Sequence, residues 1–255
     1  IQGRHITVYT SNMDVYDWLL ALLGTFLLGM GKSGLKGLGA VIVTLMAIVF
    51  GGKESTGVLI PMMIAADVFA VIYYHRHTQW YFLKKLLPMM VLGVLIGVWW
   101  GGSISELLFK RVMAIIILIS VLAMIWMDRS RSIKIPKNAL FSSSMGLLAG
   151  VTSMIGNLAG AFTSVYLLAM RLPKNEFIGT AAWLFFIINV FKLPFHVFSW
   201  ETVTSETLKI NLLLSPAIAL GFFSGVRIVK LIDNNLYRKF ILVVTGVGAV
   251  FILLN

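Results

Sequence analysis

Residues 28–38 have the sequence LGMGKSGLKGL, which interrupts an apolar run that extends from Trp18 to Phe50. This interruption contains four glycines, one serine and two lysines. Its apolar flanks are each about half a bilayer to one bilayer long, at ~1.5 Å per helical residue. We therefore expect the break to lie inside a membrane, where irregular backbone survives only if protein buries it or a watery cavity borders it.

The two lysines of this break are the reason to predict a binding site. On insertion scales, a lysine within the bilayer costs roughly 2.5 to 3.5 kcal/mol. Lys32 and Lys36 both lie among the glycines of the break, and a bound anion would offset the cost of burying their charge. The pattern therefore predicts an anion site.

The composition of the chain is typical of a protein that crosses a membrane several times. Of its 255 residues, 59% are hydrophobic and 12% are charged, and the mean hydropathy is +0.93. These values lie outside the range of soluble domains. We attribute the net charge of +11 first to cytoplasmic loops, so no nucleic-acid partner is expected. The absence of cysteine excludes disulfides and thiolate metal sites.

Apolar segments bounded by glycine, proline or charge predict two sets of five helices. In each set, a break rich in glycine and serine joins the first two segments. No secretory signal pattern precedes the first segment, so we expect that segment to belong to the membrane domain. The first set comprises 14–30, 35–50, 57–74, 81–100 and 107–127, and the second comprises 139–152, 158–170, 177–198, 208–226 and 236–254.

The two sets are related by an offset of 122 residues, which indicates an internal duplication. Several glycines and one triplet recur at this spacing, and the offset becomes 124 farther along the chain. The pairs are Gly24 with Gly146, Gly34 with Gly156, Gly57 with Gly179, the triplet 67–69 (DVF) with 189–191 (NVF), Gly97 with Gly221, and Gly101 with Gly225.

The distribution of lysine and arginine predicts the orientation of the segments. The connections at 75–85, 128–137, 171–176 and 227–239 hold 13 of the 21 Lys and Arg residues, and the connections on the other side hold five. The first group is therefore expected to be cytoplasmic. The third segments of the two sets then cross in opposite directions, so we expect an all-α membrane protein of two inverted repeats, an architecture typical of secondary transporters.

This orientation divides the chain into four parts. Both ends are expected on the outer side, and the two membrane repeats are joined inside the cell. The parts are an N-terminal extracytoplasmic segment at 1–13, a first membrane repeat at 14–127, a basic cytoplasmic linker at 128–138, and a second membrane repeat at 139–255.

The predicted substrate site is formed where the two breaks meet near mid-membrane. Helices that start after the breaks would direct free N–H groups and a positive dipole end at a ligand between the repeats. Close helix packing by small residues is an alternative explanation for the glycines and serines. The predicted substrate-binding residues are Gly31, Lys32, Ser33, Gly34 and Lys36 in the first break, and Thr152, Ser153, Gly156 and Asn157 in the second.

Asp67 and Asn189 are matched polar residues on the third segment of each half. Asp67 is the only carboxylate away from the ends of the predicted spans. Three roles remain open for it: a proton-coupling group, an ion-pair partner of Lys32 or Lys36, or a hydrogen-bonding group in helix packing. Lys192 follows one turn after Asn189, and we interpret it as a structural lysine that snorkels toward the outer surface.

No pattern for catalysis, metal binding or a cofactor is present. The chain has no HExxH sequence, and GMGKSG lacks the spacing of a phosphate-binding P-loop. His75 and His77 lie in a basic connection, where exposure to solvent is the expected state. We therefore expect a protein that is not an enzyme and needs no cofactor.

Residues 29–39 (GMGKSGLKGLG), together with Pro61, Asp67 and residues 73–80 (YYHRHTQW), resemble the pattern of the sulfite exporter TauE/SafE family. The resemblance covers nearly the whole chain, and it includes the second glycine break. It implies a permease for sulfite, sulfoacetate or related small sulfur anions, usually in a bacterial inner membrane. The second break departs from the family pattern because Met154 stands where a polar residue is usual.

We therefore expect a secondary transporter that moves a small sulfur-containing oxyanion, such as sulfite, thiosulfate or an organosulfonate, by alternating access. Proton coupling is one of the roles open for Asp67. An anion channel, a carboxylate carrier and a membrane subunit that docks a soluble enzyme remain alternatives. The expected partners are a small anion and the lipid bilayer, and the sequence leaves self-association open.

Overall fold

Helices make up the structure, which is a computed structural model that describes residues 13–35, 37–101 and 138–233, with the isolated positions 105, 108, 111, 112, 115 and 236. No strand occurs among these residues. The elements are α2 (Val15–Lys32), α3 (Gly39–Phe50), α4 (Gly52–Tyr74), η2 (His75–His77), α5 (Trp80–Gly101), α7 (Ala139–Gly156), α8 (Ala159–Ala169), α9 (Lys174–Phe198) and α10 (Ser205–Leu231). The segments predicted at 107–127 and 236–254 fall almost entirely outside the described residues.

Six of these helices are long and apolar enough to cross a membrane, namely α2, α4, α5, α7, α9 and α10. The expected class, an all-helical multi-pass membrane protein, is therefore confirmed. α3 has 12 residues and α8 has 11, which gives each a length of only ~16–18 Å against a hydrocarbon core of ~30 Å. Their length supports the predicted position of both breaks inside the membrane.

The first break is longer than the sequence suggested. The helix expected to start near Leu35 begins at Gly39, so that prediction was wrong. The reason is the backbone of Gly34 and Gly37, whose φ angles are 126° and 99°. Such values are open to glycine but interrupt a right-handed helix. α2 itself continues to Lys32, past its expected end.

The third helix of each half starts earlier than expected, because its polar first turn was attributed to the preceding loop. α4 begins at Gly52, and the hydroxyls of Ser55 and Thr56 donate to carbonyl oxygens three residues back. α9 begins at Lys174 directly after Pro173. Proline is favoured at helix starts, where a missing N–H costs nothing.

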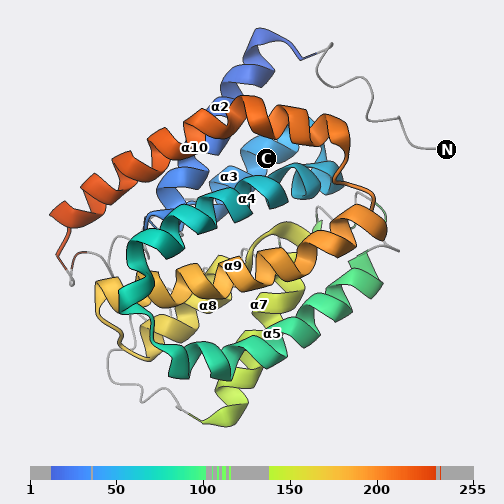
Figure 1. Cartoon of the computed structure of the whole chain (residues 1–255). Helices are drawn as coiled ribbons and strands as arrows, with labels where there is room; N and C mark the ends of the chain where they lie inside the picture. The colour runs from blue at the N-terminus through green and yellow to red at the C-terminus, as the bar shows by residue number, and fades with distance from the viewer. Residues whose placement is uncertain are drawn as a thin grey trace.

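α4 and α9 lie side by side through the middle of the molecule (Figure 1). On one side of this pair, α10 packs along α2 and against α4, and on the other side α5 packs along α7 and against α9. α10 belongs to the second half of the sequence but packs on α2 of the first half, and α5 of the first half packs on α7 of the second half. We call the two groups the first bundle (α2, α3, α4 and α10) and the second bundle (α5, α7, α8 and α9).

The directions of the helices support the predicted inverted repeat. α4 and α9 begin 122 residues apart and run antiparallel: a Cβ at Gly57 would lie 2.3 Å from the carbonyl oxygen of Thr202, and one at Gly179 would lie 2.6 Å from that of Tyr74. Asp67 and its counterpart Asn189 contact each other near the crossing. A two-fold axis between the halves would bring two equivalent residues into contact in this way.

Glycine allows the two swapped helix pairs to approach closely. A Cβ at Gly150 of α7 would lie 2.0 Å from the carbonyl oxygen of Met90 in α5, and a Cβ at Gly221 of α10 would lie 2.0 Å from that of Phe26 in α2. Small residues at such positions are the usual means of packing helices in lipid, where dispersion replaces the hydrophobic effect.

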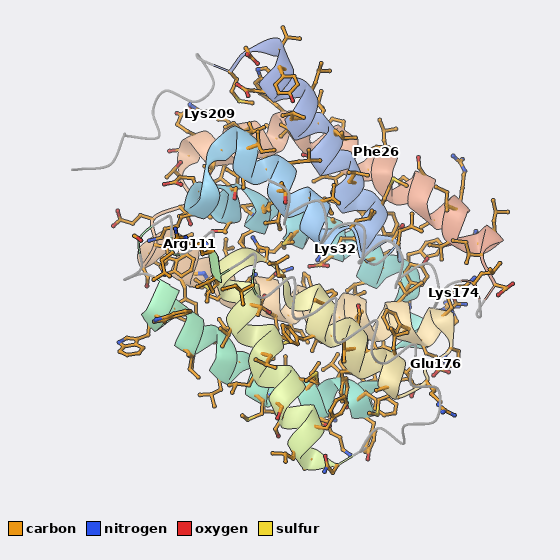
Figure 2. All side chains as sticks on the ribbon, turned by 180° about the vertical axis from the view of Figure 1, so that it is seen from behind. Phe26, Lys32, Arg111, Lys174, Glu176 and Lys209 are labelled. Carbon is orange, nitrogen blue, oxygen red and sulfur yellow. The ribbon has the colours of Figure 1, made fainter. Side chains whose placement is uncertain are left out.

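The charged residues at the helix ends match the predicted sides of the membrane. Figure 2 shows Arg111 and Lys209 near one end of the long helices and Lys174 and Glu176 near the opposite end, with Lys32 deep between them. The Nζ atom of Lys174 donates to the carbonyl oxygens of Val229 and Ile232. A lysine at this position satisfies the free carbonyl groups that end α10.

We predict that Gly150→Val and Gly221→Val each lower the stability of the purified protein by about 1–3 kcal/mol, because the added side chain meets backbone that can move only if the helix pair separates. The measurement is the unfolding temperature in detergent. Gly39→Ala is the control, since a Cβ there would meet no atom within 4 Å. An equal loss of stability in all three variants would contradict this explanation.

Candidate functional site

A cavity of about 100 Å³ lies between the two breaks. Its walls come from both halves of the chain: from α2, α3 and the connection between them, and from α7, α8 and α9. About 10–15 Å³ of such volume holds one water molecule, so the cavity has room for a small polyatomic guest. The lining is mostly apolar, and Lys32, Ser153, Asn157, Asn189 and Lys192 supply its polar side chains together with Ser164.

Lys32, Asp67 and Asn189 form a buried chain of polar contacts across the two halves. The Nζ atom of Lys32 lies 2.7 Å from Oδ1 of Asp67, and Nδ2 of Asn189 donates to Oδ2 of the same carboxylate at 2.6 Å. The ammonium also lies 4.9 Å from the ring centroid of Phe185. Because Lys32 is the last residue of α2, its charge also interacts favourably with the negative end of that helix.

Lys192 is the second buried cation of the site, with no exposed surface. Its Nζ atom donates to the carbonyl oxygen of Ser153 at 2.9 Å, to Oγ of Ser153 at 3.0 Å and to Oδ1 of Asn157 at 2.7 Å. All three acceptors are neutral, and within the described part of the chain no carboxylate pairs with this lysine. Hydrogen bonds satisfy its donors, but its charge is not balanced by a neighbouring carboxylate.

Asn157 holds Lys192 because of its position at the end of α7. Its backbone is left-handed, with φ 57° and ψ 26°, a conformation that asparagine tolerates better than most residues. This turn directs Oδ1 toward Lys192, while Nδ2 donates to the carbonyl oxygen of Thr56 in α4 at 3.2 Å. The asparagine therefore connects the second break to the first bundle.

The helices that follow the breaks begin at the cavity without side-chain caps. Neither Leu38 before α3 nor Leu158 before α8 supplies a cap hydrogen bond, and Gly39 and Gly160 both line the cavity. A Cβ at either glycine would meet no atom within 4 Å, so the backbone is open there. Free N–H groups and the positive ends of two helix dipoles therefore face the same space.

The structure brings together part of the predicted site. Gly31, Lys32, Ser153, Asn157 and Asn189 line the cavity. Asp67 lies directly behind Lys32 and Asn189 and contacts both. Lys36 lies outside the described residues.

Four predicted residues, Ser33, Gly34, Thr152 and Gly156, are not among those that line the cavity. The hydroxyl of Ser33 donates to the carbonyl oxygen of Met30, and that of Thr152 donates to the carbonyl oxygen of Leu148. A Cβ at Gly34 would lie 2.6 Å from the side chain of Ile178. These residues shape and pack the breaks, which matches the alternative explanation considered for the small residues.

Lys192 was interpreted wrongly from the sequence. We expected it to snorkel near the outer surface because Pro194 suggested a kink, but α9 continues through Pro194 to Phe198 and buries the lysine. A signal was present: Asn189, Lys192 and His196 are spaced three and four residues apart, which places them on one helix face. All three are buried.

The buried face of α9 ends in a second polar contact beyond the cavity. Nδ1 of His196 lies 2.9 Å from Oγ1 of Thr202, and the imidazole packs edge-on against Trp200. The backbone N–H groups of Thr202 and Val203 donate to the carbonyl oxygen of His196. These contacts fold the chain back after α9 and hold Thr202 against Gly57 of α4.

Taken together, six membrane-length helices and a cavity with buried lysine and amide side chains between two helix breaks define an integral membrane protein of the transporter class. A comparison with protein families matches residues 19–252 to the sulfite exporter TauE/SafE family, and the chain belongs to that family. The family comprises membrane transporters of sulfur-containing anions rather than enzymes. Comparisons with curated proteins and with solved structures found no match.

The ion pair of Lys32 and Asp67 is buried, so removal of one partner should lower the stability strongly. We predict that Lys32→Met lowers stability by about 3–5 kcal/mol, because it leaves a carboxylate buried without its cation. Adding Asp67→Asn to Lys32→Met should recover much of the lost stability. A double-mutant cycle measured by thermal unfolding would show this recovery. The control is Lys209→Met, which breaks the exposed pair with Glu206 and should cost no more than about 1 kcal/mol. Equal losses for Lys32→Met and Lys209→Met would contradict the buried pairing.

Proposed function

We propose that this protein is a permease that moves a small sulfur-containing oxyanion, such as sulfite, thiosulfate or an organosulfonate, through the cavity between its two breaks. The site consists of Lys32, Lys192, Ser153 and Asn189, together with the N-termini of α3 and α8. Asp67 and Asn157 hold the two lysines in place.

The single observation that carries this proposal is the excess of buried positive charge. Two lysines border the cavity and one carboxylate, Asp67, pairs with one of them. A buried charge without a counter-ion is costly, and a bound anion would supply that counter-ion. The open N-termini of α3 and α8 add to the attraction, because helix N-termini favour anions.

The hydrogen-bond donors around the cavity suit a compact oxyanion. Lys32 uses one of its three N–H donors on Asp67. Oγ of Ser153 accepts from Lys192, which leaves its own proton to donate toward a guest. Asn189 uses one of its two amide protons on Asp67. Several donors from different directions match a tetrahedral or pyramidal sulfur oxyanion better than a long apolar molecule.

The arrangement of the two bundles supports transport by alternating access. The cavity is lined by α2 and α3 of the first bundle and by α7, α8 and α9 of the second. The bundles meet along α4 and α9 (Figure 1). A rocking motion of one bundle against the other about this contact would expose the cavity to each side in turn, as in other inverted-repeat carriers.

The proposed location is the inner membrane of a bacterium. The end of the molecule that carries Lys174 and Glu176 (Figure 2) would face the cytoplasm, since the described parts of three connections rich in lysine and arginine, at 75–85, 171–176 and 227–233, lie at that end. The proposed halves are the membrane repeats at 14–127 and 139–255, joined by the basic linker at 128–138.

We predict that Lys192→Gln lowers thiosulfate uptake into proteoliposomes at least tenfold, because the amide removes the unbalanced charge while it keeps a donor for Ser153. Tenfold corresponds to about 1.4 kcal/mol of lost anion stabilisation. The measurement is initial uptake of labelled thiosulfate against concentration. Lys209→Gln, at an exposed position near the start of α10, is the control and should transport normally. Unchanged uptake in Lys192→Gln would refute this assignment.

A second prediction uses the space of the cavity. Gly160→Leu should fold normally, because a Cβ there meets no atom within 4 Å, yet it should abolish uptake because the side chain occupies the cavity. Two measurements test this prediction: thiosulfate uptake into proteoliposomes that contain Gly160→Leu, and the unfolding temperature of the same variant. Normal uptake with normal stability would mean that the anion does not pass this residue. Flux that never saturates in the unaltered protein would favour a channel over a carrier.

A further inference from the structure

We infer that the hydrogen bond from Asn157 to Thr56 is a latch that keeps the cavity closed toward the proposed outer side, and that an anion bound to Lys192 releases it. This inference rests on the proposed function, and it names the contact through which the substrate would open its own path. Three features support it: the positions of the two breaks on opposite sides of the cavity, the contact of Asn157 between the two bundles, and the acceptors that occupy Lys192.

The second break lies between the cavity and the proposed outer end of the molecule. Asn157 lines the cavity, and its Nδ2 atom donates to the carbonyl oxygen of Thr56, in the second turn of α4. α4 begins where α9 ends, since a Cβ at Gly57 would lie 2.3 Å from the backbone that follows α9. This is the end of the molecule at which Lys209 lies, opposite to Lys174 on the proposed cytoplasmic side (Figure 2).

The first break lies on the other side of the cavity. A Cβ at Gly34 would lie 2.6 Å from the side chain of Ile178 and 3.3 Å from that of Val229, near the start of α9 and the end of α10. The carbonyl oxygen of Ser33 accepts a hydrogen bond from the hydroxyl of Tyr74, the last residue of α4. These contacts belong to the proposed cytoplasmic half, so the two breaks bound the cavity from opposite sides.

The hydrogen bond from Asn157 to Thr56 joins the two bundles. Asn157 follows the last residue of α7 in the second bundle, and Thr56 belongs to α4 in the first. A rocking motion that opens the cavity toward the outer side separates these two elements and breaks this buried bond. Because the bond is formed in the structure, it stabilises the state that is closed on this side.

Lys192 controls Asn157 because its hydrogen-bond donors are all in use. An ammonium group has three N–H donors. Those of Lys192 bind the carbonyl oxygen of Ser153, Oγ of Ser153 and Oδ1 of Asn157. An anion can therefore accept a hydrogen bond from this ammonium group only if it replaces one of the three acceptors.

Asn157 is the acceptor that an anion would replace. The carbonyl oxygen of Ser153 is fixed by the last turn of α7 and also accepts from the backbone N–H of Asn157. Oγ of Ser153 can keep its contact with Lys192 while it donates its own proton to the anion. Oδ1 of Asn157 is a neutral oxygen on a side chain that can turn, and a charged acceptor binds an ammonium group more strongly. Once Oδ1 is released, the amide can rotate, which weakens its contact with Thr56.

Anion binding and opening of the outer side therefore favour each other. The coupling also acts in reverse, because the free energies of two linked events are reciprocal. A change that removes Oδ1 of Asn157 from Lys192 should raise the affinity for the anion. If Asn157 instead held the substrate directly, removal of its side chain would lower the affinity, so the sign of the effect separates the two roles.

Thr56→Cys reports the state of the latch. The unaltered chain has no cysteine, and the side chain of Thr56 is 1% exposed and is not among those that line the cavity. Its backbone carbonyl remains available to Asn157 after the substitution. The measurement is the rate at which an impermeant maleimide labels Thr56→Cys from the outer side of right-side-out vesicles, without any sulfur oxyanion. Adding Asn157→Gly should raise this rate about threefold to tenfold, as expected for the loss of one neutral hydrogen bond.

Two substitutions of Asn157 test the coupling to Lys192, and both suit its left-handed backbone. Asn157→Gly removes an acceptor from Lys192 and should raise the affinity for thiosulfate roughly fivefold, measured by calorimetry on the whole chain in nanodiscs. Asn157→Asp also loses the bond to Thr56, but its carboxylate binds Lys192 more tightly than the amide does. It should raise the labelling rate and lower the thiosulfate affinity at least about tenfold.

Asn138→Gly is the matched control, because Asn138 caps the opposite end of α7, and it should change neither quantity. If both Asn157 variants leave the labelling rate unchanged, the latch is wrong. If Asn157→Gly lowers the thiosulfate affinity or leaves it unchanged, the coupling is wrong while the permease proposal stands. Should Asn157→Gly not fold, the labelling rate and the affinity of Asn157→Asp decide the two parts. If the unaltered protein binds neither thiosulfate, sulfite nor methanesulfonate, the proposed function itself fails, and the labelling rates still decide the latch.

Discussion

The structure depends on keeping two ammonium groups inside a membrane. Lys192 is fully buried and is held by neutral oxygens of Ser153 and Asn157, while Lys32 pairs with the carboxylate of Asp67. The cost of these charges explains why the backbone is broken at both sites. Broken helices provide free carbonyl and N–H groups at a depth where an intact helix offers none, so the breaks and the lysines belong to one arrangement.

The predicted duplication of the chain would explain how a shared cavity can form. The third helices of the two halves cross antiparallel at Asp67 and Asn189, and the swapped pairs, α2 with α10 and α5 with α7, tie each half to the other. The equivalent positions are no longer identical in chemistry, because Asp67 faces Asn189 and Lys32 corresponds to Met154. This loss of symmetry places one carboxylate between the two halves of the described structure, where it pairs with Lys32 and accepts a hydrogen bond from Asn189.

Much of the fold could be predicted because lipid restricts the possible structures. In a bilayer every backbone group must be satisfied within a helix, so apolar length and interruptions by Gly31, Lys32 and Gly34 indicate spans and breaks directly. The recurrence of residues 67–69 at 189–191 predicts a two-fold arrangement, and the contact between Asp67 and Asn189 is consistent with it. The predicted helix starts were less accurate. α3 begins later than predicted, at Gly39, because Gly34 and Gly37 interrupt the helix, and α4 begins earlier, at Gly52, because its polar first turn resembles a loop.

The sequence by itself determined the class of protein, the two breaks, and Lys32, Asp67, Ser153, Asn157 and Asn189 as polar groups of the membrane interior. Only the tertiary structure decided which of them share a cavity, that Lys32 rather than another lysine pairs with Asp67, and that Lys192 is a buried cation instead of a snorkelling one. The physical reason is that hydropathy reports the burial of a segment in lipid. Which face of α9 meets α7 is set by packing between residues far apart in the chain, and that contact decides the environment of its charge.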